Sequence, residues 1–125
     1  TILAGAGADP SWVVGAPLAA TGRAWHLGAG APFVVEADES DGSFRQYPAG
    51  VVVITNVEAD HLDNWGTPQA YADGFVALAT SGAVETVVIS ADDPGAVAIT
   101  PAIRSEMGLG PQMPNASWSV TSSTP

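Results

Sequence analysis

The chain contains no cysteine and no lysine, and its only basic residues besides two histidines are three arginines. The lack of cysteine excludes disulfides, thiolate chemistry and zinc–thiolate sites. Thirteen acidic residues give a net charge of −10 and a pI near 4.1. Nucleic acids and anionic membranes both require a basic surface, so neither is expected as a partner. The surplus of carboxylates instead favours cations.

Long apolar runs are also absent, since no stretch approaches the roughly 20 residues of a membrane span. The first ten residues lack the basic lead of a signal peptide, and we therefore expect a cytoplasmic protein. A length of 125 residues with 46% hydrophobic and 13% charged residues is typical of one soluble globular domain.

Two short apolar runs, Phe33–Val35 and Val51–Ile54, are typical of buried strands, and each turns polar where it ends. Residues 37–50 between them are long enough for the dozen or so residues that a parallel crossover needs. Ser40 or Asp41 is available there as a helix cap. If the strands are parallel neighbours, both polar ends fall on the carboxyl edge of the sheet, where ligands bind in open α/β folds.

That arrangement would bring Glu36 and His61 together. A carboxylate with an imidazole is a reasonable partial shell for Mg²⁺ or Mn²⁺, and the imidazole suits Mn²⁺ better. The alternative is that the acidic cluster is a solvated face and that His61 is an ordinary surface or capping residue. Spacing alone does not decide between these two hypotheses.

The N-terminal part carries few ordering signals. Residues 1–8 are predicted as the end of a helix, and Ser11–Val14 as a short strand that residues 15–17, Gly-Ala-Pro, break. Residues 18–30 are predicted as a loop, in which His26 is a solvated residue.

The part after His61 has clearer signals. Thr67 as N-cap and Pro68 at the first helical position predict a helix that ends at Gly82, followed by a strand at Thr86–Ile89. The helix places one apolar stripe in the core, comprising Tyr71, Phe75, Leu78 and Ala79. The elements together indicate an α/β chain with a partial doubly wound, mainly parallel sheet of three or four strands.

Two motifs in this order, EADESDGSF at residues 36–44 and VVVITNVEADHLD at residues 51–63, resemble the central, ATP-binding domain of the Mur ligases. The resemblance is to the branch that joins L-alanine to UDP-N-acetylmuramate. DPSWVVG at residues 9–15 and ADDPG at residues 91–95 fall in the matching order around them. The resemblance covers about residues 1–97.

The resemblance implies an ATP-dependent ligase that activates the muramoyl carboxylate as an acyl phosphate, which the amino group of L-alanine attacks. Glu36 and His61 stand at the positions that bind a divalent metal, Mg²⁺ or Mn²⁺, beside the ATP phosphates, and are the implied catalytic pair. Asn56 and Asp60 stand in the same signature loop and would shape the substrate site. His26 matches a position that can touch the muramoyl substrate.

The chain also departs from this family. Relatives cradle the phosphates with GxxxxGK[ST], which is expected upstream of residue 1, and no lysine occurs in these 125 residues. Many relatives carry Asn-Ala before the histidine that matches His26, where this chain has Ala24 and Trp25. Domains that hold the UDP-sugar and close over the nucleotide are not matched either. We therefore expect the chain to be inactive alone.

Two further segments leave alternatives open. Asp92 and Asp93 precede Pro-Gly, which favours an Asx turn, although both could approach the nucleotide. Residues 98–125 are predicted to be a divergent, flexible tail because they are rich in Gly, Pro, Ser and Thr. A second hypothesis of a different class is a non-catalytic acidic module that binds a divalent cation or a partner chain, or that self-associates through exposed sheet edges.

Overall fold

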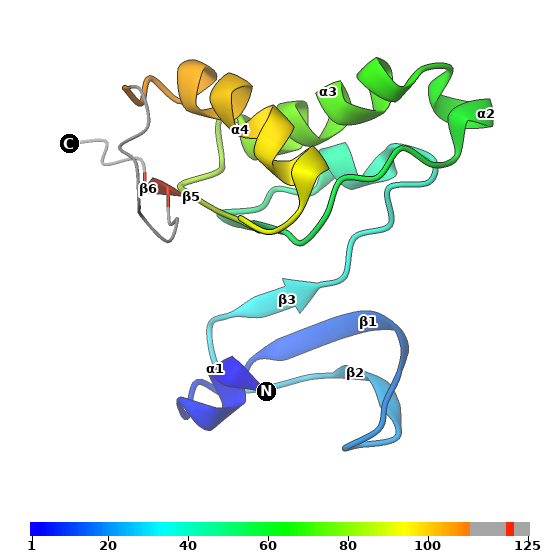
Figure 1. The fold of residues 1–125 in the computed structure, drawn as a ribbon. Coiled ribbons are helices and arrows are strands. Elements are labelled where there is room, and N and C mark those ends of the chain that lie inside the picture. Colours follow the sequence, from blue (N-terminus) through cyan, green and yellow to red (C-terminus); the bar gives the residue numbers. More distant parts are fainter. Residues whose placement is uncertain (111–119, 122–125) are drawn as a thin grey trace. The chain divides into compact units, whose positions relative to one another are not determined.

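The computed structural model describes residues 1–110 and the backbone of residues 120–121. The chain divides into two compact units, Thr1–Asp38 and Glu39–Pro125. Each unit has its own three-stranded sheet, with strand orders β2-β1-β3 and β4-β5-β6 (Figure 1). The mixed α/β class with parallel strand pairs confirms the predicted fold class.

In the first unit, a short helix α1 (Ile2–Gly5) precedes the central strand β1 (Ser11–Leu18). Strand β2 (Arg23–His26) pairs with β1 in antiparallel fashion, and β3 (Phe33–Val35) pairs with its other edge in parallel. A helix within residues 1–8 and a strand at residues 33–35 are confirmed, but the burial predicted for that strand is wrong, since Phe33 and Val34 are 65% and 41% exposed.

Two predictions for this unit are wrong. Strand β1 does not break at Gly15–Pro17 but continues to Leu18, and residues 18–30 contain β2 rather than only loop. The register between the two strands shifts between Val13 and Leu18, so the residues between them lie in an irregularity of the ladder. Pro17, which has no N–H to donate, is tolerated there because bulges and edges do not need that bond.

The second unit contains a parallel pair of strands with two helices on one face (Figure 1). Its elements are η1 (Ser43–Gln46), β4 (Val51–Ile54), α2 (Leu62–Trp65), α3 (Pro68–Ala79), β5 (Thr86–Ile89), α4 (Pro94–Glu106) and β6 (Val120–Thr121). Strands β4 and β5 pair from Val51–Thr86 to Ile54–Ile89, and β6 adds to β5 in antiparallel fashion.

The crossover segment differs from the prediction. Residues 37–50 contain one turn of 3₁₀ helix, η1, and Asp41 Oδ1 accepts a hydrogen bond from Ser43 N at 2.8 Å. Strands β3 and β4, which the sequence suggested as neighbours in one sheet, belong to the sheets of different units. A single apolar residue of this segment, Phe44, is buried, and one anchor is too little to stabilise a longer amphipathic helix.

The core of the second unit lies between the β4–β5 pair and the helices α3 and α4. Burial alternates along β4, where Val52 and Ile54 are buried while Val51 and Val53 are 61% and 63% exposed. The expectation that this strand is buried on both faces is therefore wrong for the described residues. Buried residues of the helices include Tyr71, Val76, Leu78, Ala79, Ile99 and Ile103.

Helix α3 begins where the sequence predicts. The Thr67 side chain accepts a hydrogen bond from Ala70 N at 3.1 Å, and Pro68 occupies the first turn. The predicted stripe faces the core, with Phe75 partly buried beside it. The helix ends at Ala79, just before the predicted stop at Gly82.

Helix α4 corrects the predicted boundary at residue 97. The helix continues to Glu106 through Pro101, and Thr100 Oγ1 donates to the carbonyl of Ala96 at 2.9 Å. Ile99 and Ile103 are buried, and this packing outweighs the hydrogen bond that Pro101 removes. Residues 111–119 and 122–125 of the predicted tail lie outside the described residues.

We predict that residue 74 of α3 must be glycine, because the ring of Trp65 occupies the space of a side chain there. A Cβ at residue 74 would lie 2.5 Å from that ring. We expect Gly74→Ala to lower the free energy of unfolding by about 1–2 kcal/mol, because an overpacking cost of about 2–3 kcal/mol, the upper part of the usual range, exceeds the ~1 kcal/mol gain in helix propensity. Urea unfolding measures the change. Gly82→Ala is the matched control, since no atom lies within 4 Å of a Cβ there, and equal stability changes in the two variants would contradict the prediction.

Candidate functional site

The loop of residues 55–61 carries three of the predicted site residues, Asn56, Asp60 and His61, and follows the carboxyl end of β4. Strand β5 runs parallel to β4, so the turn after β5 lies at the same edge of the sheet. The ladder continues one residue beyond the strands, because Ser90 N donates to the carbonyl of Ile54 at 2.9 Å. A carboxyl edge of two parallel strands is therefore formed within the second unit, but it joins β4 to β5 and not, as predicted, to β3, after which Glu36 stands.

Asp93 joins the 55–61 loop to α4. Its Oδ1 accepts hydrogen bonds from Ala96 N at 2.7 Å and from Val57 N at 2.9 Å. The backbone N–H groups of Ala96 and Val57 hold the pKa of this carboxyl below its ordinary value. The structure has a helix N-cap where an Asx turn was predicted, and the bond to Val57 was not foreseen either, because residues far apart in sequence make it.

Gly95 lies directly under the same loop. A side chain at this position would collide with the Val57 carbonyl, so only glycine allows the approach. The ADDPG motif therefore supplies both a carboxylate that accepts from the loop and a gap that the loop fills.

His61 has left-handed backbone geometry, with φ of 50°, and forms the N-cap of α2. Its N–H donates to Asp60 Oδ1 at 2.7 Å, and its carbonyl accepts from Asn64 N at 2.9 Å. This conformation is uncommon for a residue with a side chain. The imidazole is exposed. Asn56 Oδ1 accepts from Thr55 Oγ1 at 3.0 Å.

Trp65 at the end of α2 contacts the second half of the EADES motif. Its Nε1 donates to the Glu39 carbonyl at 3.0 Å, and Asn64 Nδ2 donates to the Ser40 carbonyl at 3.1 Å. The Arg45 guanidinium lies 5.4 Å from the centre of the Trp65 ring. Side chains of α2 thus hold residues 39 and 40 in place by donating to their backbone carbonyls. The sequence did not predict this role of α2.

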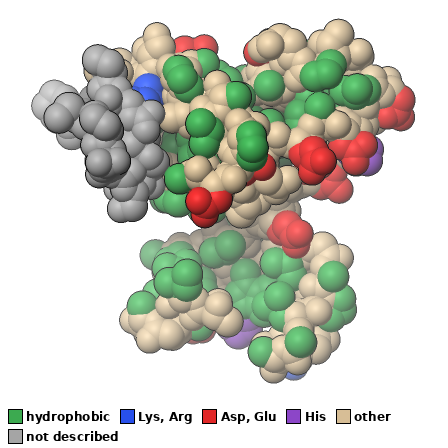
Figure 2. Space-filling view, viewed as in Figure 1, with side chains coloured by type: hydrophobic (Ala, Val, Ile, Leu, Met, Phe, Trp, Pro, Cys, Tyr) green, Lys and Arg blue, Asp and Glu red, His purple; other side chains and the backbone are tan. Residues whose placement is uncertain are grey.

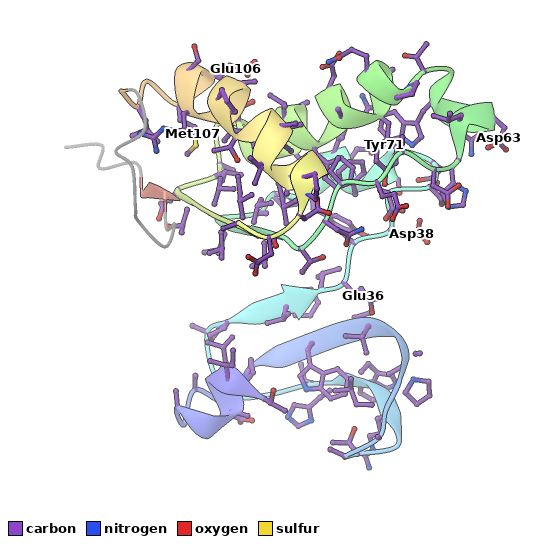
Figure 3. All side chains as sticks on the ribbon, viewed as in Figure 1. Glu36, Asp38, Asp63, Tyr71, Glu106 and Met107 are labelled. Carbon is purple, nitrogen blue, oxygen red and sulfur yellow. The ribbon has the colours of Figure 1, made fainter. Side chains whose placement is uncertain are left out.

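Tyr71 lies on α3 (Figure 3), within reach of the charges of three carboxylates. Burial, followed by the charges of Glu39, Asp60 and Glu58, raises the pKa of Tyr71 to about 12. The phenol therefore stays neutral near pH 7 and cannot serve as a base. Figure 2 shows acidic side chains gathered beside the histidine of this unit, a charge arrangement that favours a cation.

Glu36 lies in the first unit, directly after β3 (Figure 3). Its Oε2 accepts a hydrogen bond from Gly15 N at 2.7 Å, and its own N–H donates to the Val13 carbonyl at 2.9 Å. The backbone of the DPSWVVG motif therefore orients this carboxylate.

Glu36 and His61 fit a divalent ion by their donor chemistry, since both side chains are exposed and one Glu36 oxygen is oriented by a backbone N–H. Among residues 1–110, no three or more His, Asp or Glu side chains form a group that could hold a metal. Mg²⁺ commonly uses one or two protein ligands together with substrate phosphates. That Glu36 and His61 share one ion stays a prediction.

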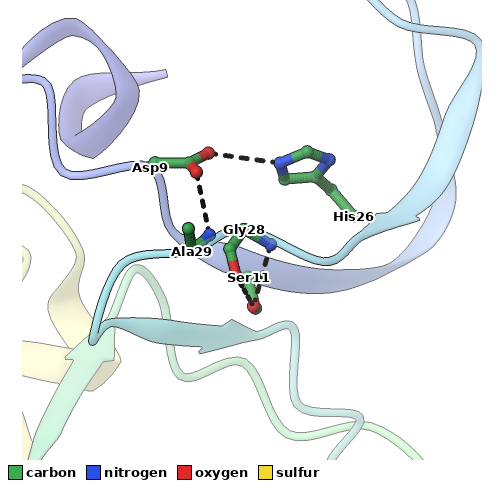
Figure 4. A network of polar contacts seen from close by, with 5 residues as sticks. All are labelled: Asp9, Ser11, His26, Gly28 and Ala29. Carbon is green, nitrogen blue, oxygen red and sulfur yellow. Dashed lines mark hydrogen bonds and ion pairs between the residues drawn. The ribbon is translucent and has the colours of Figure 1, made fainter.

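His26 lies on β2 within a network of polar contacts (Figure 4). Its Nε2 is 3.4 Å from Asp9 Oδ1, and Asp9 Oδ2 accepts a hydrogen bond from Ala29 N at 2.8 Å. Ser11 Oγ accepts from Gly28 N at 3.0 Å. These bonds fix the turn after β2, so His26 is a strand residue with a local partner rather than a solvated loop residue. Its contact with substrate stays a prediction.

Asp9 is predicted to titrate below its ordinary value of 3.8, because the Ala29 N–H and then His26 stabilise the ionised carboxylate and lower its pKa. The ionised Asp9 carboxylate therefore stabilises the fold fully at pH values above 3.8, and this stabilisation is lost as the pH falls through the lowered pKa. NMR titration of the Asp9 carboxyl measures the midpoint, and the Ala29 amide shift should follow it. Asp9→Asn should abolish that amide titration, whereas a midpoint at or above 3.8 would contradict the assignment.

A family model described as the Mur ligase middle domain matches residues 31–107. The UDP-N-acetylmuramate–L-alanine ligase of Cutibacterium acnes is 72% identical over 96 residues, which are 77% of this chain and 20% of that protein. The ligase of the same name from Nocardioides sp. is 52% identical over 98 residues, 78% of this chain and 22% of that protein. The one from Clavibacter michiganensis is 52% identical over 104 residues, 83% and 22% respectively.

The parallel strands and the polar loop at their carboxyl edge define an α/β protein whose sheet has a polar carboxyl edge. The chain belongs to the Mur ligase middle domain family. Mur ligases are in general ATP-dependent ligases. The chain spans about a fifth of the length of the curated relatives that it matches, and the family match extends past residue 97 to the end of α4. None of the described helices has the length and hydropathy needed to cross a membrane.

Proposed function

We propose that this chain forms part of the catalytic domain of a cytoplasmic ligase that uses ATP to join L-alanine to UDP-N-acetylmuramate for peptidoglycan synthesis. The observation that carries the proposal is the 72% identity over 96 residues to a ligase of that name. In the proposed reaction the γ-phosphoryl group of ATP passes to the muramoyl carboxylate, which gives ADP and an acyl phosphate. The L-alanine amino group then attacks the acyl carbon, and the amide forms with release of phosphate and a proton.

Glu36 and His61 are the proposed ligands of the divalent ion, Mg²⁺ or Mn²⁺. Such an ion screens the negative charge of ATP phosphates next to a substrate carboxylate. Within this chain, the Gly15 N–H orients the Glu36 carboxylate, and Asp60 and Asn64 bind the backbone around His61. The two proposed ligands thus extend from supported backbone, as preorganised sites require.

Asn56 and Asp60 are proposed to shape the substrate site beside His61, and His26 is proposed to contact the muramoyl group. Asp60 already accepts a hydrogen bond from the His61 backbone, so its effect on the substrate runs through the loop conformation. The phosphate-binding lysine must come from outside these 125 residues, because they contain none. We therefore propose that the chain alone does not turn over.

A chimera tests this function. The matching segment of the Cutibacterium acnes relative is replaced by the corresponding residues of this chain, and phosphate release dependent on L-alanine and UDP-N-acetylmuramate is measured. We expect an active chimera, and we expect Glu36→Gln or His61→Gln to lower kcat by about 100-fold or more, as loss of a group that stabilises developing charge does.

Asp63→Asn in the same chimera is the control for the removal of a nearby charge and should retain most of the activity. A chimera with an unchanged melting temperature but no turnover would contradict the proposed function. Full activity of the Glu36→Gln variant would contradict the proposed role of that carboxylate.

A second candidate is a non-catalytic acidic module that binds a cation or a partner chain. It is favoured by the apolar face of the β4–β5 pair, where Val51, Val53 and Val88 are 61%, 63% and 38% exposed. Either candidate could bind a cation through Glu36 and His61, so the first question is whether this pair forms a metal site or is part of a diffuse acidic surface.

Mn²⁺ titration of the 125-residue chain answers this question. We expect the Glu36→Gln, His61→Gln double variant to bind Mn²⁺ at least about 10-fold more weakly, in line with the cost of disturbing a metal site. Asp63→Asn is again the control. Identical binding by the original chain and the double variant would show a diffuse acidic surface instead of a site.

A further inference from the structure

The Asp93 side chain accepts one hydrogen bond more than an N-cap requires. A capping carboxylate normally accepts from the second or third N–H of its own helix, and Asp93 does this with Ala96. The same Oδ1 also accepts from Val57 N, which belongs to a loop 36 positions away in sequence. This second bond adds nothing to the helix, and its structural effect falls on the 55–61 loop.

Gly95 reinforces the same contact. The Val57 carbonyl lies so close to Gly95 that a side chain there would overlap it. The Val57 N–H thus donates to Asp93, and the Val57 carbonyl lies against Gly95, both at the start of α4. The Val57 side chain packs against the hydrophobic core. The loop is fixed at its middle as well as at its two ends.

The fixed point is next to the residues that matter for the reaction. Val57 directly follows Asn56 and precedes His61 by four residues. At the far end of the loop, the His61 carbonyl accepts from the first turn of α2. The span between Val57 and His61 is therefore held at both ends, and a shift of Val57 would move Asn56 and His61.

We propose that Asp93 is a positioning residue that sets the 55–61 loop, and thereby Asn56 and His61, through its hydrogen bond to the Val57 N–H. The proposal rests on the proposed ligase function for its effect on the reaction. Its structural part concerns the second unit alone. The lowered pKa of Asp93 agrees with a carboxylate that is ionised while it accepts both bonds.

Asp93→Ser separates the two roles of this side chain. Serine is a good N-cap, so the bond to Ala96 is retained, but its hydroxyl is one bond shorter than the carboxylate and cannot also reach Val57. Asp93→Asn keeps an acceptor oxygen at the right distance and should restore much of the effect. Asp92→Ser is the matched control on the neighbouring acidic residue.

Two measurements decide the proposal. In the 125-residue chain, amide hydrogen exchange of Val57 should accelerate by about 10-fold or more in Asp93→Ser, as expected for a lost hydrogen bond to a charged acceptor. In the active chimera, the same variant should lower kcat by about 10-fold with a small change in melting temperature. A 10-fold loss is the lower end of the effect expected when a residue that orients a site is replaced. Asp92→Ser should leave the Val57 exchange unchanged, and Asp93→Asn should lie between in both quantities.

Unchanged Val57 exchange in Asp93→Ser would overturn the proposal, and so would full activity of that variant in an active chimera. If the chimera carrying the original sequence is itself inactive, the ligase function fails, and Val57 exchange alone then decides whether Asp93 holds the loop. The two failures are therefore distinguishable.

Discussion

The parallel pairing of β4 with β5 is the constraint on which the candidate site depends. Because the strands pair from Val51–Thr86 to Ile54–Ile89, they end level with each other. Both following segments, the 55–61 loop and the ADDPG turn, therefore start at one edge of the sheet. The contact of Asp93 with Val57 is possible only because these strand ends are aligned.

The second unit positions its loop by backbone contacts. Asp93 accepts from Val57, Gly95 gives the loop room, and Trp65 and Asn64 donate to the carbonyls of residues 39 and 40. The side chains of Asn56 and His61 remain exposed. A binding loop needs this combination of exposed side chains and a fixed backbone, because the side chains stay available to ligands while the backbone that carries them is held.

Local signals in the sequence predicted the local elements well. The bounds of β4 and β5 agree with their apolar runs, and the Thr67-Pro68 start of α3 follows from capping chemistry that acts within one turn. Strand β2 was missed because it has no apolar run, and none of the residues Arg23–His26 is buried. Helix α4 was missed because Pro101 argues against a helix in isolation, whereas burial of Ile99 and Ile103 decides the matter in the fold.

The candidate site was predictable as a set of residue types and only partly as an arrangement. Motif resemblance proposed Glu36, Asn56, Asp60 and His61 as site residues, and these roles stay predictions, since the family match shows the family of the chain alone. The bonds that hold the loop were not predictable, because Asp93 and Val57, or Trp65 and Glu39, meet only after the chain has folded. Glycine was the one hint, since Gly74 and Gly95 both mark a close approach of another segment.

The most direct test of this account is the nuclear Overhauser effect between the amide protons of Val57 and Ala96. Both N–H groups donate to the same Asp93 oxygen, which puts the two protons within about 4 Å of each other. The account predicts a clear cross-peak together with those of the β4–β5 ladder. An intact ladder without that cross-peak would show that the 55–61 loop is not held by the turn after β5, and would contradict the account.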